Sequence, residues 1–131
     1  NNYMIKTTFI ILIISLTNLV FANPQFFDTE KSFAEEYKNL RILLEKVTDP
    51  ISAQKYKPVI EEEIHRLRQT QHSGGDFFNS LTNTEKKLCV KRFQQNRFHC
   101  GEVTQVMQER RRILFSPNLS HILADTLAKI P

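Results

Sequence analysis

Glycine, tryptophan and cysteine are scarce in this chain, which has three glycines, no tryptophan and two cysteines among 131 residues. So few glycines argue against a turn-rich β-sandwich, whose many tight turns need that residue. The HExxH, GxSxG, P-loop and glycine-rich dinucleotide motifs are also missing from the sequence. We therefore predict no enzymatic activity, no cofactor and no nucleic-acid partner.

Long apolar runs are also rare, and the longest is the 13-residue stretch Phe9–Phe21. It is interrupted by three polar residues and is shorter than the roughly 20 residues that a membrane span needs. Lys6 precedes it, and small residues precede a cleavage position after Ala22. This pattern predicts a secretory signal peptide over residues 1–22 and a secreted, extracellular domain over residues 23–131, with no transmembrane span.

The two cysteines, Cys89 and Cys100, predict one disulfide bond if the chain is exported. A straight helix would separate them by about 16 Å, whereas a disulfide needs Cα atoms about 4.4–6.8 Å apart. We therefore expect the chain to turn back near Gln94-Gln95-Asn96. The alternative, two reduced and buried thiols, applies to a chain that stays inside the cell.

Apolar residues recur at helical spacing in five stretches, the first from about Asp28 and the fourth from Gly101. The predicted inner faces consist of Phe33, Tyr37, Leu40, Leu44 and Val47; Val59, Ile60, Ile64 and Leu67; Leu88, Cys89 and Phe93; Val103, Val106, Met107, Ile113 and Leu114; and Leu119, Ile122, Leu123, Leu127 and Ile130. The sequence thus predicts an all-α fold, a compact bundle of about five short helices with one disulfide.

Helix boundaries are indicated by caps and by helix breakers. Asp49-Pro50 and Ser116-Pro117 each combine a capping residue with a proline suited to the first helical turn. Thr82 and Glu85 have the spacing of a capping box. We expect Pro58 to kink or restart a helix and the segment His72–Asp76, which contains two glycines, to end one.

Positive charge is concentrated in the second half of the chain. Residues 23–81 carry eight basic and ten acidic side chains, whereas residues 82–131 carry nine basic and four acidic ones. Two interpretations are open: the halves attract each other, or the second half presents a basic surface to an acidic partner such as a polysaccharide or lipid headgroup. The predicted basic patch consists of Lys86, Lys87, Lys91, Arg92, Arg97, Arg110, Arg111 and Arg112.

Few residues are candidates for metal binding or acid–base chemistry. His65 and His72 lack the spacing of a metal site, so we predict none. The consecutive acids Glu61–Glu63 point to different sides of a helix, and we expect them to be solvated. Glu62 and Arg66 are four residues apart and should pair.

Eight phenylalanines lie in residues 23–131. They could simply fill the core, or they could line a cavity for a hydrophobic small molecule. The candidate cavity residues are Phe33, Tyr37, Phe77, Phe78 and Phe93. Separately, Asn118-Leu119-Ser120 is an N-glycosylation acceptor sequence, which an exported chain could use.

Together these features predict a secreted, non-enzymatic helical protein. It should engage a protein or receptor partner through an exposed, partly basic face. The alternative function is a carrier of a small hydrophobic ligand, similar to a fatty acid, in an apolar cavity between helices.

Overall fold

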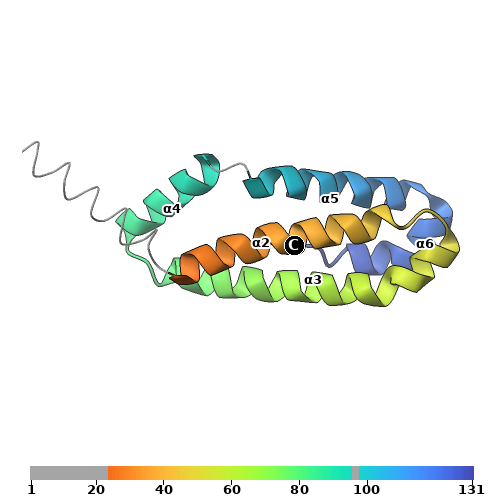
Figure 1. The fold of residues 1–131 in the computed structure, drawn as a ribbon, viewed down its shortest axis with the longest axis horizontal. Coiled ribbons are helices and arrows are strands. Elements are labelled where there is room, and N and C mark those ends of the chain that lie inside the picture. Colours follow the sequence, from red (N-terminus) through yellow and green to blue (C-terminus); the bar gives the residue numbers. More distant parts are fainter. Residues whose placement is uncertain (1–23, 96–97) are drawn as a thin grey trace, which may run out of the picture.

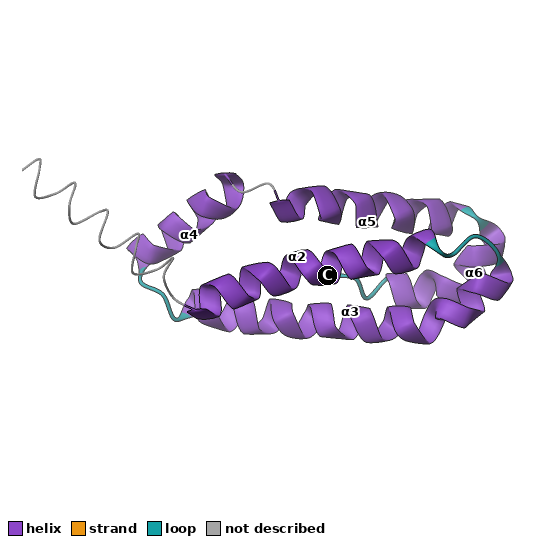
Figure 2. Cartoon of the chain, viewed as in Figure 1, coloured by secondary structure: helices purple, strands orange, loops and turns teal. Residues whose placement is uncertain are grey.

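The computed structural model describes residues 24–95 and 98–131, with the side chains of residues 31–91 and 101–131. This part of the chain is all-helical and contains no strand (Figures 1 and 2). Its five helices are α2 (Pro24–Glu45), α3 (Pro50–Asn79), α4 (Asn83–Gln95), α5 (Phe98–Phe115) and α6 (Pro117–Leu127). The predicted all-α class and number of helices are confirmed, while the predicted signal peptide lies outside the described residues.

Four of the helices enclose the core. Helix α2 packs against α3 and α5, and α6 packs against the same two helices from the other side. Helices α2 and α5 run in one direction and α3 and α6 return, whereas α4 stands apart at one end (Figure 1). The short α6 therefore covers only part of the length of the bundle.

The main core is aliphatic and takes side chains from all four packed helices. Its fully buried members include Leu40, Leu44, Val47, Ile60, Leu67, Val106, Ile113, Leu123 and Leu127. The predicted inner faces of α2 and α6 are thus confirmed. Two assigned inner residues are wrong, because Val59 on α3 and Leu114 on α5 are exposed.

Two of the three predicted helix caps form as expected. The Asp49 carboxylate accepts a hydrogen bond from the backbone N–H of Ser52 at 2.7 Å, and the Ser52 hydroxyl accepts one from the N–H of Asp49 at 3.0 Å. Thr82 and Glu85 make the reciprocal bonds of a capping box. Ser116 occupies the N-cap of α6, but its hydroxyl makes no capping bond.

Helix α3 is longer than predicted, because it neither restarts at Pro58 nor ends within residues 72–76. It continues through Pro58, which is exposed. Because proline has no backbone N–H, the carbonyl group of Gln54 accepts no hydrogen bond from it, but water can reach this carbonyl on the exposed side. It also continues through Gly74 and Gly75. The buried ring of Phe77 anchors this last part of α3 in a second, smaller cluster with Cys89, Phe78 and Leu81. Helices α2 and α5 likewise begin earlier than predicted, at Pro24 and Phe98.

The α2–α3 interface contains two carboxylates with unsatisfied oxygen atoms. Glu63 is only 5% exposed, and its Oε1 atom is buried without a hydrogen-bond donor. The Oε2 atom of Glu36 is also buried without a donor, although its Oε1 atom accepts a hydrogen bond from Thr70 at 2.8 Å. Burial raises the pKa of Glu36 above its ordinary value of 4.5, and the nearby charge of Glu63 raises it further. The prediction that Glu63 is solvated is therefore wrong.

Candidate functional site

An open groove with a volume of about 500 Å³ lies along the outer face of α5. Its described lining residues recur at steps of three, one, three and one along the helix, so they form a single stripe. They are Met107, Arg110, Arg111, Leu114 and Phe115. We call this surface the α5 groove. The core residues Val106 and Ile113 lie on the adjacent, inward face of the same helix.

Helix α5 is held in place by contacts to α2 near both of its ends. Arg41 on α2 donates to Glu102 at 2.6 Å and to Glu45 at 3.0 Å, and these bonds raise the pKa of Arg41. Near the other end, Arg112 donates to the backbone carbonyl of Leu44 at 2.9 Å and to Glu109 at 2.7 Å. The groove therefore lies on a helix whose position is fixed.

The guanidinium groups of Arg110 and Arg111 remain without carboxylate partners among the described residues. The Nε atom of Arg110 is buried with no hydrogen-bond partner, and its Nη1 atom meets only the sulfur of Met107, at 3.9 Å. Arg111 is exposed and has no ion pair within the described chain. Arg111 is exposed and Arg110 is partly exposed, so a carboxylate from outside could form charge-assisted hydrogen bonds with the accessible nitrogen atoms of these guanidinium groups.

The apolar part of the groove is also incompletely covered. Met107 is half-buried against the main core, whereas Leu114 is 37% exposed and Phe115 is 79% exposed. The groove thus combines uncovered apolar surface with cations that lack partners. It contains no nucleophile or general base among its described lining residues.

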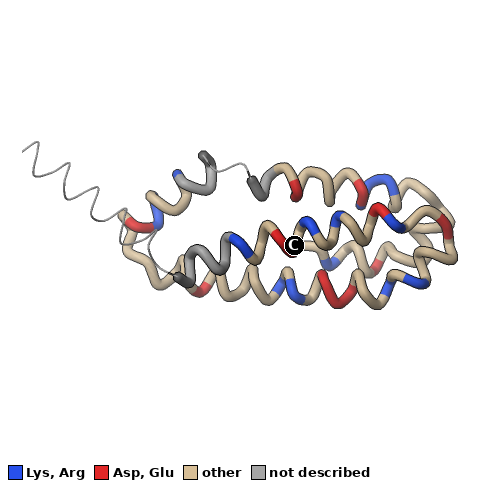
Figure 3. Tube along the Cα trace, in the orientation of Figure 1, with Lys and Arg blue, Asp and Glu red and all other residues tan. Residues whose placement is uncertain are grey.

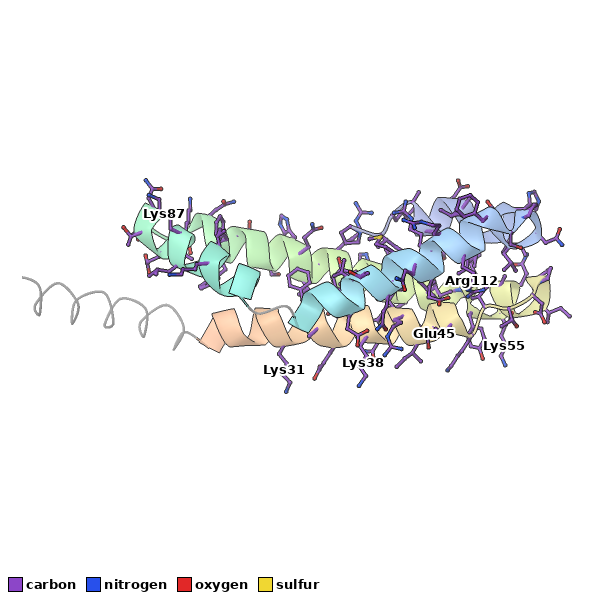
Figure 4. All side chains as sticks on the ribbon, turned by 90° about the horizontal axis from the view of Figure 1, so that it is seen from above. Lys31, Lys38, Glu45, Lys55, Lys87 and Arg112 are labelled. Carbon is purple, nitrogen blue, oxygen red and sulfur yellow. The ribbon has the colours of Figure 1, made fainter. Side chains whose placement is uncertain are left out.

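The predicted basic patch is not one surface. Lys86, Lys87 and Lys91 belong to α4 at one end of the molecule, whereas Arg110–Arg112 lie on α5 toward the other end (Figures 3 and 4). Arg112 faces α2 rather than the groove. The side chains of Arg92 and Arg97 lie outside the described residues. Only Arg110 and Arg111 of the predicted set line the α5 groove.

The predicted aromatic cavity is divided in the same way. Phe33 and Tyr37 stack with ring centroids 6.3 Å apart and belong with the main core. Phe77 and Phe78 belong to the second cluster at the α3–α4 junction, and the side chain of Phe93 lies outside the described residues. None of the four described side chains lines either described hollow. The cavity interpretation therefore lacks geometric support in this part of the chain.

The two cysteines and the glycosylation sequence have different outcomes. Cys89 is buried in the second cluster. The structure does not support the predicted disulfide, and the side chain of Cys100 lies outside the described residues. Asn118 is exposed in the first turn of α6, where a glycan would extend into solvent.

A second hollow, of about 310 Å³, lies between α3 and the end of the chain. It is polar, with Thr126 donating to Glu61 at 3.1 Å. Its lining residues are Glu61, Ile64, His65, Arg68, Thr126 and Lys129. No group of three or more histidine, cysteine or acidic side chains suited to a metal ion occurs among the described residues.

Comparison with known proteins gives no assignment: no protein family, no curated protein and no solved structure matches this chain. Among the described helices, none is both long and apolar enough to cross a membrane.

Proposed function

We propose that this protein is a secreted, non-enzymatic binding protein whose α5 groove engages an acidic, amphipathic segment of a partner protein. The observation that carries the proposal is that Arg110 and Arg111, which have no carboxylate partner among the described residues, lie beside uncovered apolar side chains in one groove. A partner carboxylate would pair with the guanidinium groups of Arg110 and Arg111, and apolar partner residues would cover Leu114 and Phe115.

An amphipathic helix suits this surface because the groove is a stripe along one helix. A partner helix with apolar residues at i, i+3, i+4 and i+7 would place them along the stripe, with acidic residues beside them to reach Arg110 and Arg111. Association should weaken as salt is added, since charge attraction contributes to it.

The groove can be tested with two synthetic peptides of identical composition, each about 18 residues or five helical turns long. In the first peptide, leucine and glutamate are arranged to form an acidic amphipathic helix. In the second peptide, the same residues follow an order that gives no apolar face. We expect only the first to bind in fluorescence anisotropy, and Arg110→Gln to weaken it about tenfold through loss of a charge-assisted hydrogen bond.

The matched control is Lys87→Gln, which removes the same charge from the distant helix α4 and should change peptide affinity less than about twofold. Equal binding of the permuted peptide, or equal effects of the two substitutions, would show that binding depends on net charge alone, which would contradict the proposal. If instead the protein takes up a fluorescent fatty acid at one per chain and Leu114→Ser abolishes this uptake, the carrier alternative replaces the proposal.

Export and the Cys89–Cys100 bridge are part of the same proposal and are supported by the sequence alone. Intact mass of the protein purified from culture medium should correspond to a chain that begins at Asn23 and lacks two hydrogen atoms. A glycan on Asn118 would add to that mass. Retention of residues 1–22, or alkylation of both cysteines without prior reduction, would contradict this part of the proposal.

A further inference from the structure

The two most exposed large apolar side chains of the described chain lie at the same end of the bundle. Ile51 is 81% exposed and Phe115 is 79% exposed, whereas the other exposed large apolar residues range from 36% to 46%. Ile51 follows the α2–α3 turn, and Phe115 precedes the α5–α6 turn. Both turns are at the end of the molecule opposite α4 (Figure 1).

Short connections hold both side chains in position. Ile51 is in the first turn of α3, which the reciprocal bonds between Asp49 and Ser52 fix at 2.7 and 3.0 Å. Phe115 is the last residue of α5, and Ser116 alone connects it to α6. The backbone N–H of Ser116 donates to the carbonyl of Ile113 at 3.1 Å. The two apolar groups thus project from well-defined backbone and not from long loops.

The same end of the bundle carries an excess of positive charge (Figure 3). Residues 45–57 and 109–121 contain six basic and three acidic side chains. All three acids are already engaged: Glu45 pairs with Arg41, Glu109 pairs with Arg112, and Asp49 caps α3.

Two lysines of this end stand beside an aromatic ring and remain accessible. The Nζ atoms of Lys46 and Lys55 lie 5.6 and 5.3 Å from the ring centroid of Tyr56, and both side chains are exposed. Lys55 is seen projecting at this end in Figure 4. We call the set Lys46, Ile51, Lys55, Arg111 and Phe115 the tip.

We infer that the tip docks on an anionic lipid bilayer, with Ile51 and Phe115 entering the headgroup region and the cations contacting lipid phosphates and carboxylates. Apolar groups that project from two separate turns suit a deformable, planar interface, where basic residues add electrostatic attraction. Helices α2, α3 and α5 run along the long axis, so the bundle would stand on the membrane by one end (Figure 1). This inference goes beyond the proposed function, because it concerns a different partner and includes residues outside the α5 groove.

The test is flotation of the secreted protein with lipid vesicles, after intact mass has verified that residues 1–22 are absent. We expect binding to vesicles of phosphatidylcholine with about one third phosphatidylserine and little binding to phosphatidylcholine alone. Ile51→Ser should lower the partition coefficient about tenfold, because it removes an inserted apolar side chain.

Val90→Ser is the matched control, since Val90 is 44% exposed on α4 at the opposite, also basic, end. It should change partitioning less than about twofold. Ile51→Ser should also leave binding of the acidic peptide unchanged, which separates the tip from the α5 groove. Absence of vesicle binding, equal binding to neutral vesicles, or equal partitioning of Ile51→Ser and the unmodified protein would overturn the inference. The last result, combined with displacement by heparin, would identify a soluble polyanion as the ligand instead.

Discussion

Replacing Leu44 by alanine should lower the free energy of unfolding by about 3 kcal/mol, within the range of 2–5 kcal/mol typical of buried leucines. Leu44 is fully buried in the main core, near the end of α2. Truncation removes apolar contacts and leaves a cavity that neighbouring helices fill only in part. Urea denaturation measures this loss of stability. The unfolding can be followed by circular dichroism at about 222 nm, where α-helices give a strong signal.

Ile42→Ala is the matched control for that substitution. Ile42 lies two residues earlier on the same helix, has the same side-chain volume and is 36% exposed. We expect it to cost less than about 1 kcal/mol, since less apolar surface is lost from the interior. Equal losses for the two variants would mean that α2 presents a different face to the core from the one described.

The helical class and most of the core could be predicted because they depend on local periodicity. The spacing of Tyr37, Leu40, Leu44 and Val47 defines one face of a helix whatever that helix packs against. Capping is also local, so Asp49 could be recognised from its neighbours alone.

The continuity of α3 could not be predicted in this way. Local propensity gives Gly74 and Gly75 a cost of about 1 kcal/mol each in a helix. The burial of Phe77 against Cys89 helps to offset that cost, and this contact depends on where α4 lies. A tertiary contact thus outweighed a correct local preference.

Only part of the α5 groove could be predicted from the sequence. Three consecutive arginines span about 200° around a helix, so all three cannot line one groove. This geometry could have separated Arg112 from its neighbours. The hydrogen bond from Arg112 to the carbonyl of Leu44 depends on the placement of α2, so the sequence alone could not show it. The sequence also assigned Leu114 to the core, because it fits the apolar stripe as well as Ile113 does.

Replacing Glu63 by methionine should stabilise the protein by about 1–2 kcal/mol at neutral pH. The side chain of Glu63 is almost fully buried, with one oxygen atom lacking a donor, so its charge is poorly solvated. Its partner Arg66 is more than half exposed and also pairs with Glu62. Removing Glu63 therefore leaves no buried charge uncompensated, and methionine fills a similar volume.

The gain should depend on pH in a definite direction. Because the pKa of Glu36 is raised in the folded state, folded protein keeps that proton at pH values where the unfolded chain has lost it. Stability therefore falls as pH rises from about 4.5 toward neutrality. Glu63→Met removes one cause of the raised pKa, so its advantage should be largest near pH 7 and smaller near pH 4.5.

The midpoints of urea-induced unfolding at both pH values test the prediction for Glu63→Met, with Glu62→Gln as the control. Glu62 is adjacent in sequence, and 61% of its side chain is exposed. Its replacement should therefore change stability by less than about 0.5 kcal/mol at either pH. A Glu63→Met variant that is less stable than the unmodified protein at pH 7 would mean that Glu63 stabilises the α2–α3 interface. Its unsatisfied oxygen would then have to be hydrated or paired in solution.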